Sequence, residues 1–227
     1  MKKTLVFVAS MFVAAILFLS PAKAAEFKLG GVVNFAAYYA NVKETLKDSG
    51  HISEKEAIAG FEYGTIFAEF SSDAAMGIGV GVEYSPGAIE LSDERRTLVD
   101  NVNSTEDDGE QVADASFEDL LHVYLTIPIF DTGGYIKAGA SRVELLTKET
   151  LTTGSKYNDT TVDGVSLGVG VEYDLADMVF VRLEGMYTDW DDVKLSGTEE
   201  GGTSGSYNNI EAEMGGVAAR AAIGFQF

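Results

Sequence analysis

The stretch SLGVGVEYDLADMVFVRLEGMY, residues 166–187, alternates between two kinds of side chain. In its first half, large apolar residues occupy the odd positions, and Ser, Gly, Gly and Glu occupy the even ones. In its second half, Val, Val and Leu alternate with Arg182 and Glu184. Successive side chains of a strand point to opposite faces, so each half predicts a strand with one apolar face and one face of small and ionisable residues. The segment DLAD between them, residues 174–177, predicts a tight turn.

The same period of two recurs along the chain and predicts eight strands. They are expected at about 27–40, 58–71, 76–85, 121–130, 134–146, 166–175, 178–187 and 210–227. The connections alternate in length, with tight turns at 71–74, 131–134 and 174–177 and long polar loops at about 41–57, 86–117, 147–161 and 195–209. Because all tight turns then lie at one end, the pattern predicts an antiparallel up-and-down meander.

The two faces of these strands predict an inverted barrel. One face carries rows of Leu, Val, Ile and Tyr, and the other combines Gly and Ser with ionisable residues. The ionisable residues assigned to that second face are Lys28, Glu62, Glu83, His122, Lys137, Glu172, Arg182, Glu184 and Arg220. Small and charged residues suit a narrow interior, and closure of eight strands pairs every backbone amide, as a bilayer demands. We therefore expect an all-β, eight-stranded transmembrane barrel. A soluble barrel is the alternative, but soluble barrels place their bulky apolar residues inside.

The last ten residues, AARAAIGFQF at 218–227, predict how the barrel closes. Every second position counted back from Phe227 is apolar, so this segment is expected to pair with the first strand. Aromatic residues near strand ends match the interfacial girdles of membrane barrels. The residues assigned to these girdles are Tyr39, Tyr63, Tyr84, Tyr173, Tyr187, Phe225 and Phe227, and Trp190 is also expected at the membrane interface.

The first residues of the chain have the pattern of an export signal. Two lysines precede an apolar run over 5–19, and Ala-Lys-Ala at 22–24 is a small-x-small cleavage site. The pattern predicts a signal peptide over residues 1–24 and a single barrel domain over 25–227. The alternative interpretation is an uncleaved membrane anchor, but the apolar run is short for a membrane span.

The composition excludes one class of partner. The chain has 36 acidic and 16 basic residues and a formal charge of −20, whereas nucleic-acid binding needs a basic face. Cysteine is absent, so disulfides do not contribute to stability. The acids gather at 86–117 and 189–211, where a divalent-cation site at 107–110 and a hydrated, self-repelling loop are the two interpretations. Because the charge run lacks EF-hand spacing, no metal and no cofactor is expected.

These features resemble the eight-stranded outer-membrane barrels of Gram-negative bacteria. The sequence is similar to the OmpA-like transmembrane domain and to opacity-type proteins over the whole mature chain. The strand–turn–strand at 166–190 and the terminal aromatic strand carry the resemblance. It implies an outer-membrane location and contact with outer-membrane lipid and lipopolysaccharide. It also implies that the assembly machinery of the outer membrane reads Phe227 and Phe225.

The interior charges indicate what the lumen does. Buried charges persist only when they are paired, and the assigned interior holds four acids and four bases. The sequence therefore predicts a salt-bridge network that plugs the lumen. Its expected members are Arg182, Glu184, Arg220, Glu172, Glu83 and Lys137. The alternative is a switchable gate that passes small ions.

The expected function is a structural role in the envelope with at most weak passage of small solutes. The alternative is an adhesin or ligand-binding surface protein that acts through its extracellular loops. Those loops contain no cluster of Trp, Tyr or Arg that would mark a binding hot spot. Catalysis is not expected, because the two histidines, His51 and His122, lie in no nucleophile motif.

Overall fold

A computed structural model describes residues 25–45, 50–72, 76–98, 109–129, 132–150, 154–200 and 208–227. The predicted signal peptide, residues 1–24, lies outside these ranges, so its removal stays a prediction. The strands are β1 (Ala25–Thr45), β2 (Ile52–Ser72), β3 (Gly79–Tyr84), β4 (Ile89–Leu98), β5 (Gly109–Pro128), β6 (Gly134–Thr150), β7 (Gly154–Lys156), β8 (Thr160–Ala176), β9 (Val179–Trp190), β10 (Val193–Ser196), β11 (Thr198–Glu200) and β12 (Asn209–Gln226). No helix among the described residues is long and apolar enough to cross a membrane.

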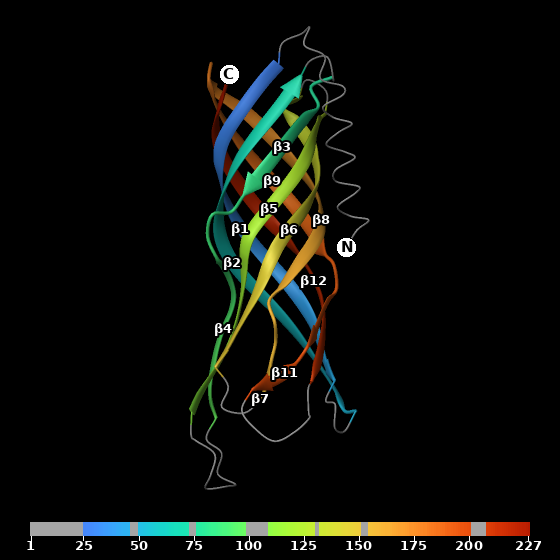
Figure 1. Ribbon diagram of the computed structural model, residues 1–227. Coiled ribbons are helices and arrows are strands. Elements are labelled where there is room, and N and C mark those ends of the chain that lie inside the picture. Colours follow the sequence, from blue (N-terminus) through green and yellow to red (C-terminus); the bar gives the residue numbers. More distant parts are fainter. Residues whose placement is uncertain are drawn as a thin grey trace.

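The strands close into a ring (Figure 1). The order is β1-β2-β3-β5-β6-β8-β9-β12, and β12 pairs back to β1, with every neighbour antiparallel. Two of the eight positions in the ring are each occupied by two successive strands. β4 follows β3 and also pairs with β5, and β10 follows β9 and also pairs with β12. The N–H of Phe227 donates to the carbonyl of Phe27 at 2.9 Å, and the reverse bond is 3.2 Å. The predicted eight-stranded antiparallel barrel, closed by its last strand, is confirmed.

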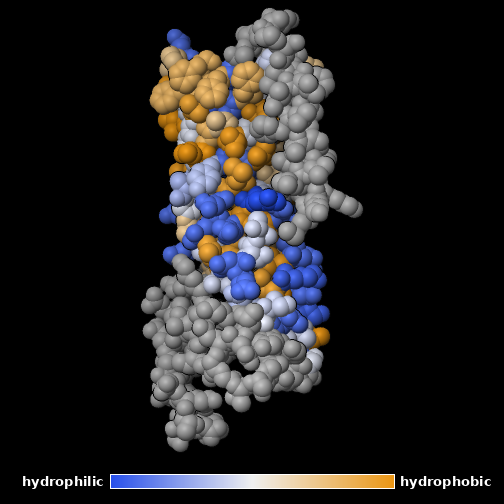
Figure 2. Space-filling model, viewed as in Figure 1, coloured by the Kyte–Doolittle hydropathy of each residue, from blue (hydrophilic) through white to orange (hydrophobic). Residues whose placement is uncertain are grey.

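The barrel is apolar outside and polar inside. Ile223, Leu183 and Val169 are 59%, 62% and 61% exposed, whereas Arg220 and Lys137 are each 3% exposed. In Figure 2 the hydrophobic residues gather in the upper part of the molecule, where Figure 1 places the chain's C-terminus, and hydrophilic residues dominate below. The apolar part therefore lies at the tight-turn end of the barrel. The predicted inversion of the two faces is confirmed.

The strands are longer than predicted and continue past the apolar band. β1 and β2 each have 21 residues, about twice the 9–11 that cross a bilayer. Outward apolar side chains of β1 run from Phe27 to Tyr39, but its ladder with β2 continues to Thr45. The predicted loops are therefore partly strand, and β4 with the start of β5 forms a hairpin in the segment expected as the loop 86–117. The centres of the four predicted loops, at 46–49, 99–108, 151–153 and 201–207, lie outside the described residues.

The tight turns lie near their predicted places with shifted limits. β8 continues to Ala176, so the turn expected at 174–177 is formed by the two residues that separate β8 from β9. β3 begins only at Gly79, after Gly77, whose φ of +75° belongs to the left-handed region that favours glycine. Residues 73–75 and 130–131 of the other two turns lie outside the described part of the chain.

Three assignments of facing were wrong. Glu62 is exposed and Tyr63 points inward, because the register pairs Glu62 with the outward Phe35 of β1. The acid of β2 that faces the lumen is Glu69, which is 3% exposed. Trp190 is 5% exposed inside the barrel and does not face the membrane, because it lies on the same side of β9 as the buried Thr188.

Candidate functional site

The lumen at the tight-turn end holds four ionisable side chains, which we call the turn-end cluster: Lys28, Glu69, Glu172 and Arg182. Arg182 donates to both carboxylate oxygens of Glu69, at 2.7 and 2.8 Å, and to Glu172 at 2.6 Å. Lys28 donates to the second oxygen of Glu172 at 2.6 Å. A pocket of about 270 Å³ opens beside this cluster, between the tight turns. The turn-end cluster therefore lines the opening of the barrel at the tight-turn end.

A second group of four lies deeper in the lumen and forms the central cluster, Glu83, Lys137, Glu184 and Arg220. Arg220 forms an ion pair with Glu184 at 2.8 Å and donates a hydrogen bond to Glu83. The Nζ atom of Lys137 lies 3.3 Å from Glu184 and 3.4 Å from Glu83. The Nε atom of Arg220 donates to the side-chain oxygen of Asn34 at 2.6 Å. Each of the four charged residues is at most 8% exposed.

The two clusters together are electrically balanced. Each contains two acids and two bases, and Tyr135 stands between them. The Tyr135 hydroxyl donates to Glu184 at 2.6 Å, and its ring centre lies 5.4 Å from the guanidinium carbon of Arg182. Removing charges from water costs several kcal/mol per ion unless partners compensate. Full pairing therefore offsets the cost of burying these charges.

Glycines make room for the aromatic rings that contact the two charged clusters. A Cβ atom added at Gly81 would overlap the ring of Tyr124, whose centre lies 3.8 Å from the Nζ of Lys137. A Cβ added at Gly170 would lie 2.5 Å from the ring of Tyr135. The small residues of the inner face are therefore required by the large ones opposite them, as in any close-packed interior.

All six residues proposed for the charge network lie in the lumen. Two of them, Arg182 and Glu172, belong to the turn-end cluster. The other four belong to the central cluster: Glu83, Lys137, Glu184 and Arg220. The structure thus separates Arg182 from Glu184, although they are two residues apart on β9. Glu69 was missed because both parities of the segment FEYGTIFAEF, 61–70, carry one Glu among apolar residues, so alternation alone does not choose between them.

The two histidines are far apart in the fold. His51 is exposed at the loop end of the barrel, and His122 is 4% exposed in the lumen. One ring nitrogen of His122 lies 2.8 Å from the Ser166 hydroxyl, and the other lies 3.9 Å from Glu83. These residue types form nucleophile–base–acid sets in hydrolases. Here all three side chains are buried, with at most 7% of each residue exposed.

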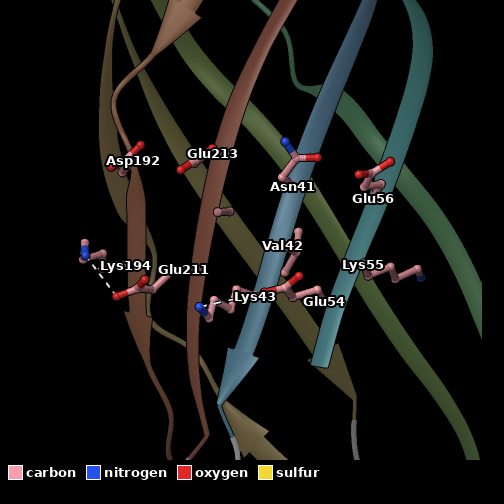
Figure 3. A pocket seen from close by; sticks show the side chains of 11 residues that line it. Asn41, Val42, Lys43, Glu54, Lys55, Glu56, Asp192, Lys194, Glu211 and Glu213 are labelled. Carbon is pink, nitrogen blue, oxygen red and sulfur yellow. Dashed lines mark hydrogen bonds and ion pairs between the residues drawn. The ribbon is translucent and has the colours of Figure 1, made fainter. Parts of the chain in front are cut away.

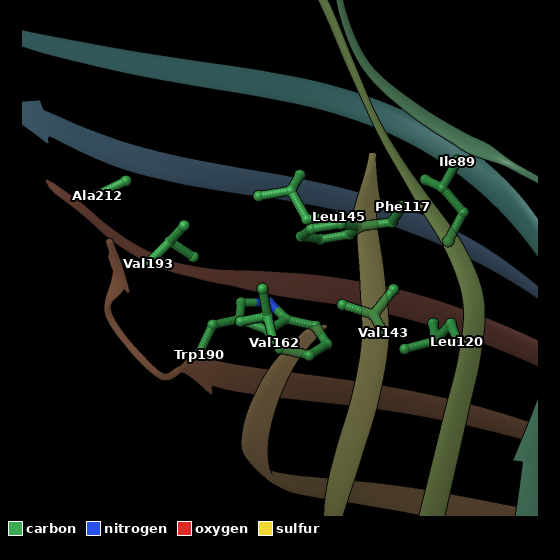
Figure 4. Close-up of a cluster of buried hydrophobic side chains, with 9 residues drawn as sticks. All are labelled: Ile89, Phe117, Leu120, Val143, Leu145, Val162, Trp190, Val193 and Ala212. Atoms are coloured by element: carbon green, nitrogen blue, oxygen red, sulfur yellow. The ribbon is translucent and has the colours of Figure 1, made fainter. Parts of the chain in front are cut away.

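An apolar layer, drawn in Figure 4, lies on the loop side of the central cluster. We call it the outer cluster, and its buried members are Ile89, Phe117, Leu120, Val143, Leu145, Val162, Trp190, Val193 and Ala212. The rings of Phe117 and Trp190 are 5.4 Å apart, and Tyr38 and Phe61 pack edge to face at 5.0 Å. The lumen therefore changes from charged to apolar along its axis. The alternation of side chains does not predict this layer, because members such as Ile89 and Phe117 fall in the acidic segment that was expected as a loop.

The barrel wall is incompletely paired beside the outer cluster. β2 pairs with β3 only from Ile66 to Ser71, and within the described part of the chain its residues 52–65 pair only with β1. The chain leaves the wall after β3 at Ser85 and Pro86, and proline donates no ladder hydrogen bond. A groove of about 370 Å³ lies here, lined by residues 62–66 of β2 and 85–88 of the β3–β4 link. We call this interruption the wall gap.

The outer surface at the loop end carries a row of alternating charges across four strands (Figure 3). Lys194 of β10 donates to Glu211 of β12 at 3.0 Å, and Glu211 is opposite Lys43 of β1 in the register. Lys43 in turn lies 3.9 Å from Glu54 of β2. The hydrogen bond from Lys194 holds the pKa of Glu211 below its usual range, and the pKa of Lys194 is raised by the same bond.

A pocket of about 380 Å³ adjoins this row of charges, and the second row that Figure 3 shows beside it is mainly acidic. Among the described residues, no group of three or more His, Cys, Asp or Glu is arranged to hold a metal ion. The two rows therefore remain a charged surface without a defined ligand site.

The fold and its lumen define a class: a small transmembrane β-barrel whose interior contains paired charges. Residues 10–219 match the family model described as the outer membrane protein beta-barrel domain. The chain therefore belongs to this family, and the protein lies in the outer membrane of a Gram-negative bacterium. The resemblance to eight-stranded outer-membrane barrels is confirmed.

Solved structures support the same fold. The chain is similar to outer membrane protein OprG from Pseudomonas aeruginosa, with 15% identity over 90% of this chain and 97% of that chain and a TM-score of 0.52. It also matches the attachment invasion locus protein Ail of Yersinia pestis (11% identity, 87% and 99% covered, TM-score 0.34) and the outer membrane protease OmpT from Escherichia coli (10%, 92% and 98%, 0.40). A comparison with curated proteins found no match. At these identities the likeness concerns the fold alone.

Proposed function

We propose that this protein has a structural role in the outer membrane and is closed along its axis to water-soluble solutes. Its weak solute passage is confined to small apolar molecules. They enter the outer cluster from the loop end and leave sideways through the wall gap into the bilayer. The observation that carries the proposal is the change of the lumen from apolar to fully paired charge, with the wall gap beside the apolar layer.

The charge clusters support the closed axis. A hydrophilic solute would have to separate ion pairs such as Arg220–Glu184 and Arg182–Glu69, and breaking a buried pair costs about 3–5 kcal/mol. An apolar solute in the outer cluster meets no such barrier toward the wall gap. Leaving sideways also keeps it in an apolar environment, which favours its transfer to lipid.

Planar-bilayer conductance tests the closed axis. We expect no stable conductance steps from the purified protein in salt solution, and steady steps would overturn the proposal. A variant with Arg182 and Arg220 both changed to Ala tests the gate alternative. If the unmodified protein shows brief openings and this variant leaves them unchanged, the plug residues do not act as a gate.

Uptake of an apolar fluorescent dye by whole cells tests the wall gap, because the lipopolysaccharide leaflet slows entry of such dyes. The chain has no cysteine, so cysteines placed at Glu62 and Ala88, on the two rims of the groove, form a unique pair. Cross-linking them with a short cleavable thiol reagent should return dye uptake to that of cells without the barrel, and cleavage should restore it. The Glu62→Cys variant alone, treated identically, is the control. Unchanged uptake after cross-linking would refute the sideways route.

Two partner assignments belong to the same proposal. The outward Phe225 and Phe227, which are 55% and 64% exposed, support recognition of the closing strand by the outer-membrane assembly machinery and its contact with lipid. The outer charged rows support contact with lipopolysaccharide. An adhesin role through the loops stays a prediction, because the loop tips lie outside the described residues.

A further inference from the structure

Within the part of the chain that the structure describes, the wall gap leaves one edge of β2 without a neighbouring strand. Residues 52–65 of β2 pair with β1 along one edge, while the opposite edge meets β3 only from Ile66 onward. An unpaired strand edge presents a row of N–H and C=O groups and is a template for another extended chain. The edge begins beside the apolar band, since Thr65 is opposite Val32 of β1, and residues 52–57 continue past Tyr39, the last outward apolar residue of β1 before the loop end. A partner from outside the cell can reach that continuation.

The parity of the backbone identifies which groups are available. The carbonyl of Gly64 accepts a hydrogen bond from the Ser85 hydroxyl at 3.1 Å, so Gly64 points its backbone toward the gap. The carbonyl of Tyr63 accepts from the side chain of Asn34 and points toward β1. Because the backbone direction alternates along a strand, the even-numbered residues from 54 to 62 also direct their N–H and C=O groups to the gap.

The strand across the gap from β2 is β4. In Figure 1 the loop end of β4 lies at the lower left, and that of β2 lies at the lower right. Within the described residues β4 forms its ladder with β5 and none with β2. Among the described residues, no strand therefore pairs with the edge of β2 that faces the gap over residues 52–65.

The side chains of this edge select the chemistry of the partner. The outward face of β2 carries three acids beside the gap, Glu54, Glu56 and Glu62, with the exposed Ile58 between the second and the third, and Figure 3 shows the first two acids on this strand. The inward face carries Phe61 and Tyr63, which pack against the outer cluster. Side chains opposite one another on paired strands interact, so basic residues match the outward face and apolar residues match the inward one.

A second copy of the barrel does not fit this edge. Two barrels in one membrane have the same orientation, and their strands tilt by about 35–45° from the axis. Strands that face each other between two such barrels would cross at roughly 70–90°, which prevents a continuous ladder. A free peptide has no such restriction.

We propose that the free edge of β2 binds an extended cationic peptide, in which basic and apolar residues alternate, as an added antiparallel strand. Basic side chains lie outward against Glu54, Glu56 and Glu62, and apolar side chains lie inward against the outer cluster. This binding does not depend on solute passage through the wall gap. Failure of the dye experiment therefore leaves it standing, and its own failure leaves the closed axis standing.

Backbone methylation of a peptide tests the proposal directly. The probe is an eight-residue fluorescent peptide of alternating Lys and Val, and the full barrel is held in lipid nanodiscs. In antiparallel pairing the peptide residues whose N–H groups face β2 carry outward side chains, so these are the lysines. N-methylation of the lysines should weaken binding about tenfold or more, while N-methylation of the valines leaves it nearly unchanged. Equal effects of the two methylated peptides, or the reverse order, would overturn the proposal.

Two variants of one residue complete the test. Gly60→Pro removes an N–H from the free edge and keeps the β1 ladder, because residue 60 points to the gap. Gly60→Ala keeps that N–H and has room, since a Cβ there meets no atom closer than 3.8 Å. We expect Gly60→Pro to lose binding and Gly60→Ala to retain it. If Gly60→Pro does not fold, as judged by heat-modifiable migration, Glu56→Gln with Glu62→Gln must weaken binding at low salt. Unchanged binding in that variant overturns the charge match.

Discussion

Replacing Arg220 with Met tests the paired charges that close the lumen. The change keeps side-chain bulk but leaves Glu83 and Glu184 with Lys137 as their only nearby cation, so the central cluster gains one uncompensated negative charge. Removing one partner of a buried ion pair costs about 3–5 kcal/mol. We expect the free energy of unfolding of Arg220→Met to fall by about that amount.

A second substitution separates lost charge balance from lost packing. Adding Glu83→Gln to Arg220→Met restores neutrality, because Glu184 and Lys137 remain as a pair 3.3 Å apart. The two sites share partners, so their effects should not add, and the double variant should be less destabilised than the sum of the two single variants by about 1–3 kcal/mol. This interaction energy is the quantity that the central cluster predicts.

Unfolding in urea, with the protein in lipid vesicles, gives the required free energies. Trp190 is the only tryptophan and is 5% exposed in the outer cluster, so its fluorescence reports loss of the folded interior. Arg142→Met is the matched control, because Arg142 bonds Asp163 at 2.7 and 2.9 Å with a side chain that is 41% exposed. Exposed pairs contribute about 0–1 kcal/mol. If Arg220→Met costs no more than Arg142→Met, the charges do not hold the lumen closed.

Three further predictions use other contacts. Gly81→Val places side-chain atoms in the ring of Tyr124 and should cost about 1–3 kcal/mol in the same urea assay. Leu167→Arg puts a charge on the apolar exterior and should cost about 2–4 kcal/mol if residue 167 lies near the bilayer midplane, again by urea unfolding. Lys194→Gln should raise the pKa of Glu211 toward its usual range, measured by NMR titration in nanodiscs. Because that pKa is lowered in the folded state, the stabilisation is present above the unfolded-state pKa and is lost as the pH falls through the folded value.

Matched controls make these three results decisive. Gly185→Val is the control for Gly81→Val, because a Cβ at Gly185 meets nothing within 4 Å. Thr161→Arg is the control for Leu167→Arg, since Thr161 is exposed on the same strand nearer the loop end. Equal losses within either pair, or a pKa of Glu211 unchanged in Lys194→Gln, would contradict the contacts described here.

The sequence was sufficient for the fold because a membrane barrel depends on parity alone. Segments such as 76–85 and 166–175 carry one purely apolar parity, and a bilayer requires that parity to face outward. In 61–70 both parities contain Glu and aromatic residues, so facing there depends on the register with β1. That register is a long-range property, which local alternation does not encode.

The outer cluster could not be predicted from the sequence for a different reason. The alternation of apolar and polar residues marks only the part of a strand that contacts lipid. Toward the loop end, both faces of β1 and β2 carry polar residues. The ladder continues past that point, and Trp190 and Phe117 turn inward to fill it. A segment read as loop on composition thus supplies the core of the outer half.

The projection of β1 from Tyr39 to Thr45 sets what the surroundings encounter first. Six residues of a strand tilted by about 40° raise the rim by roughly 15 Å. The rim is thus a collar of hydrogen-bonded strands beyond the apolar band, and we expect an antibody that approaches from outside the cell to contact these paired strands. Sequence drift in the tips would leave that collar unchanged, so epitopes on it should outlast those on the loops.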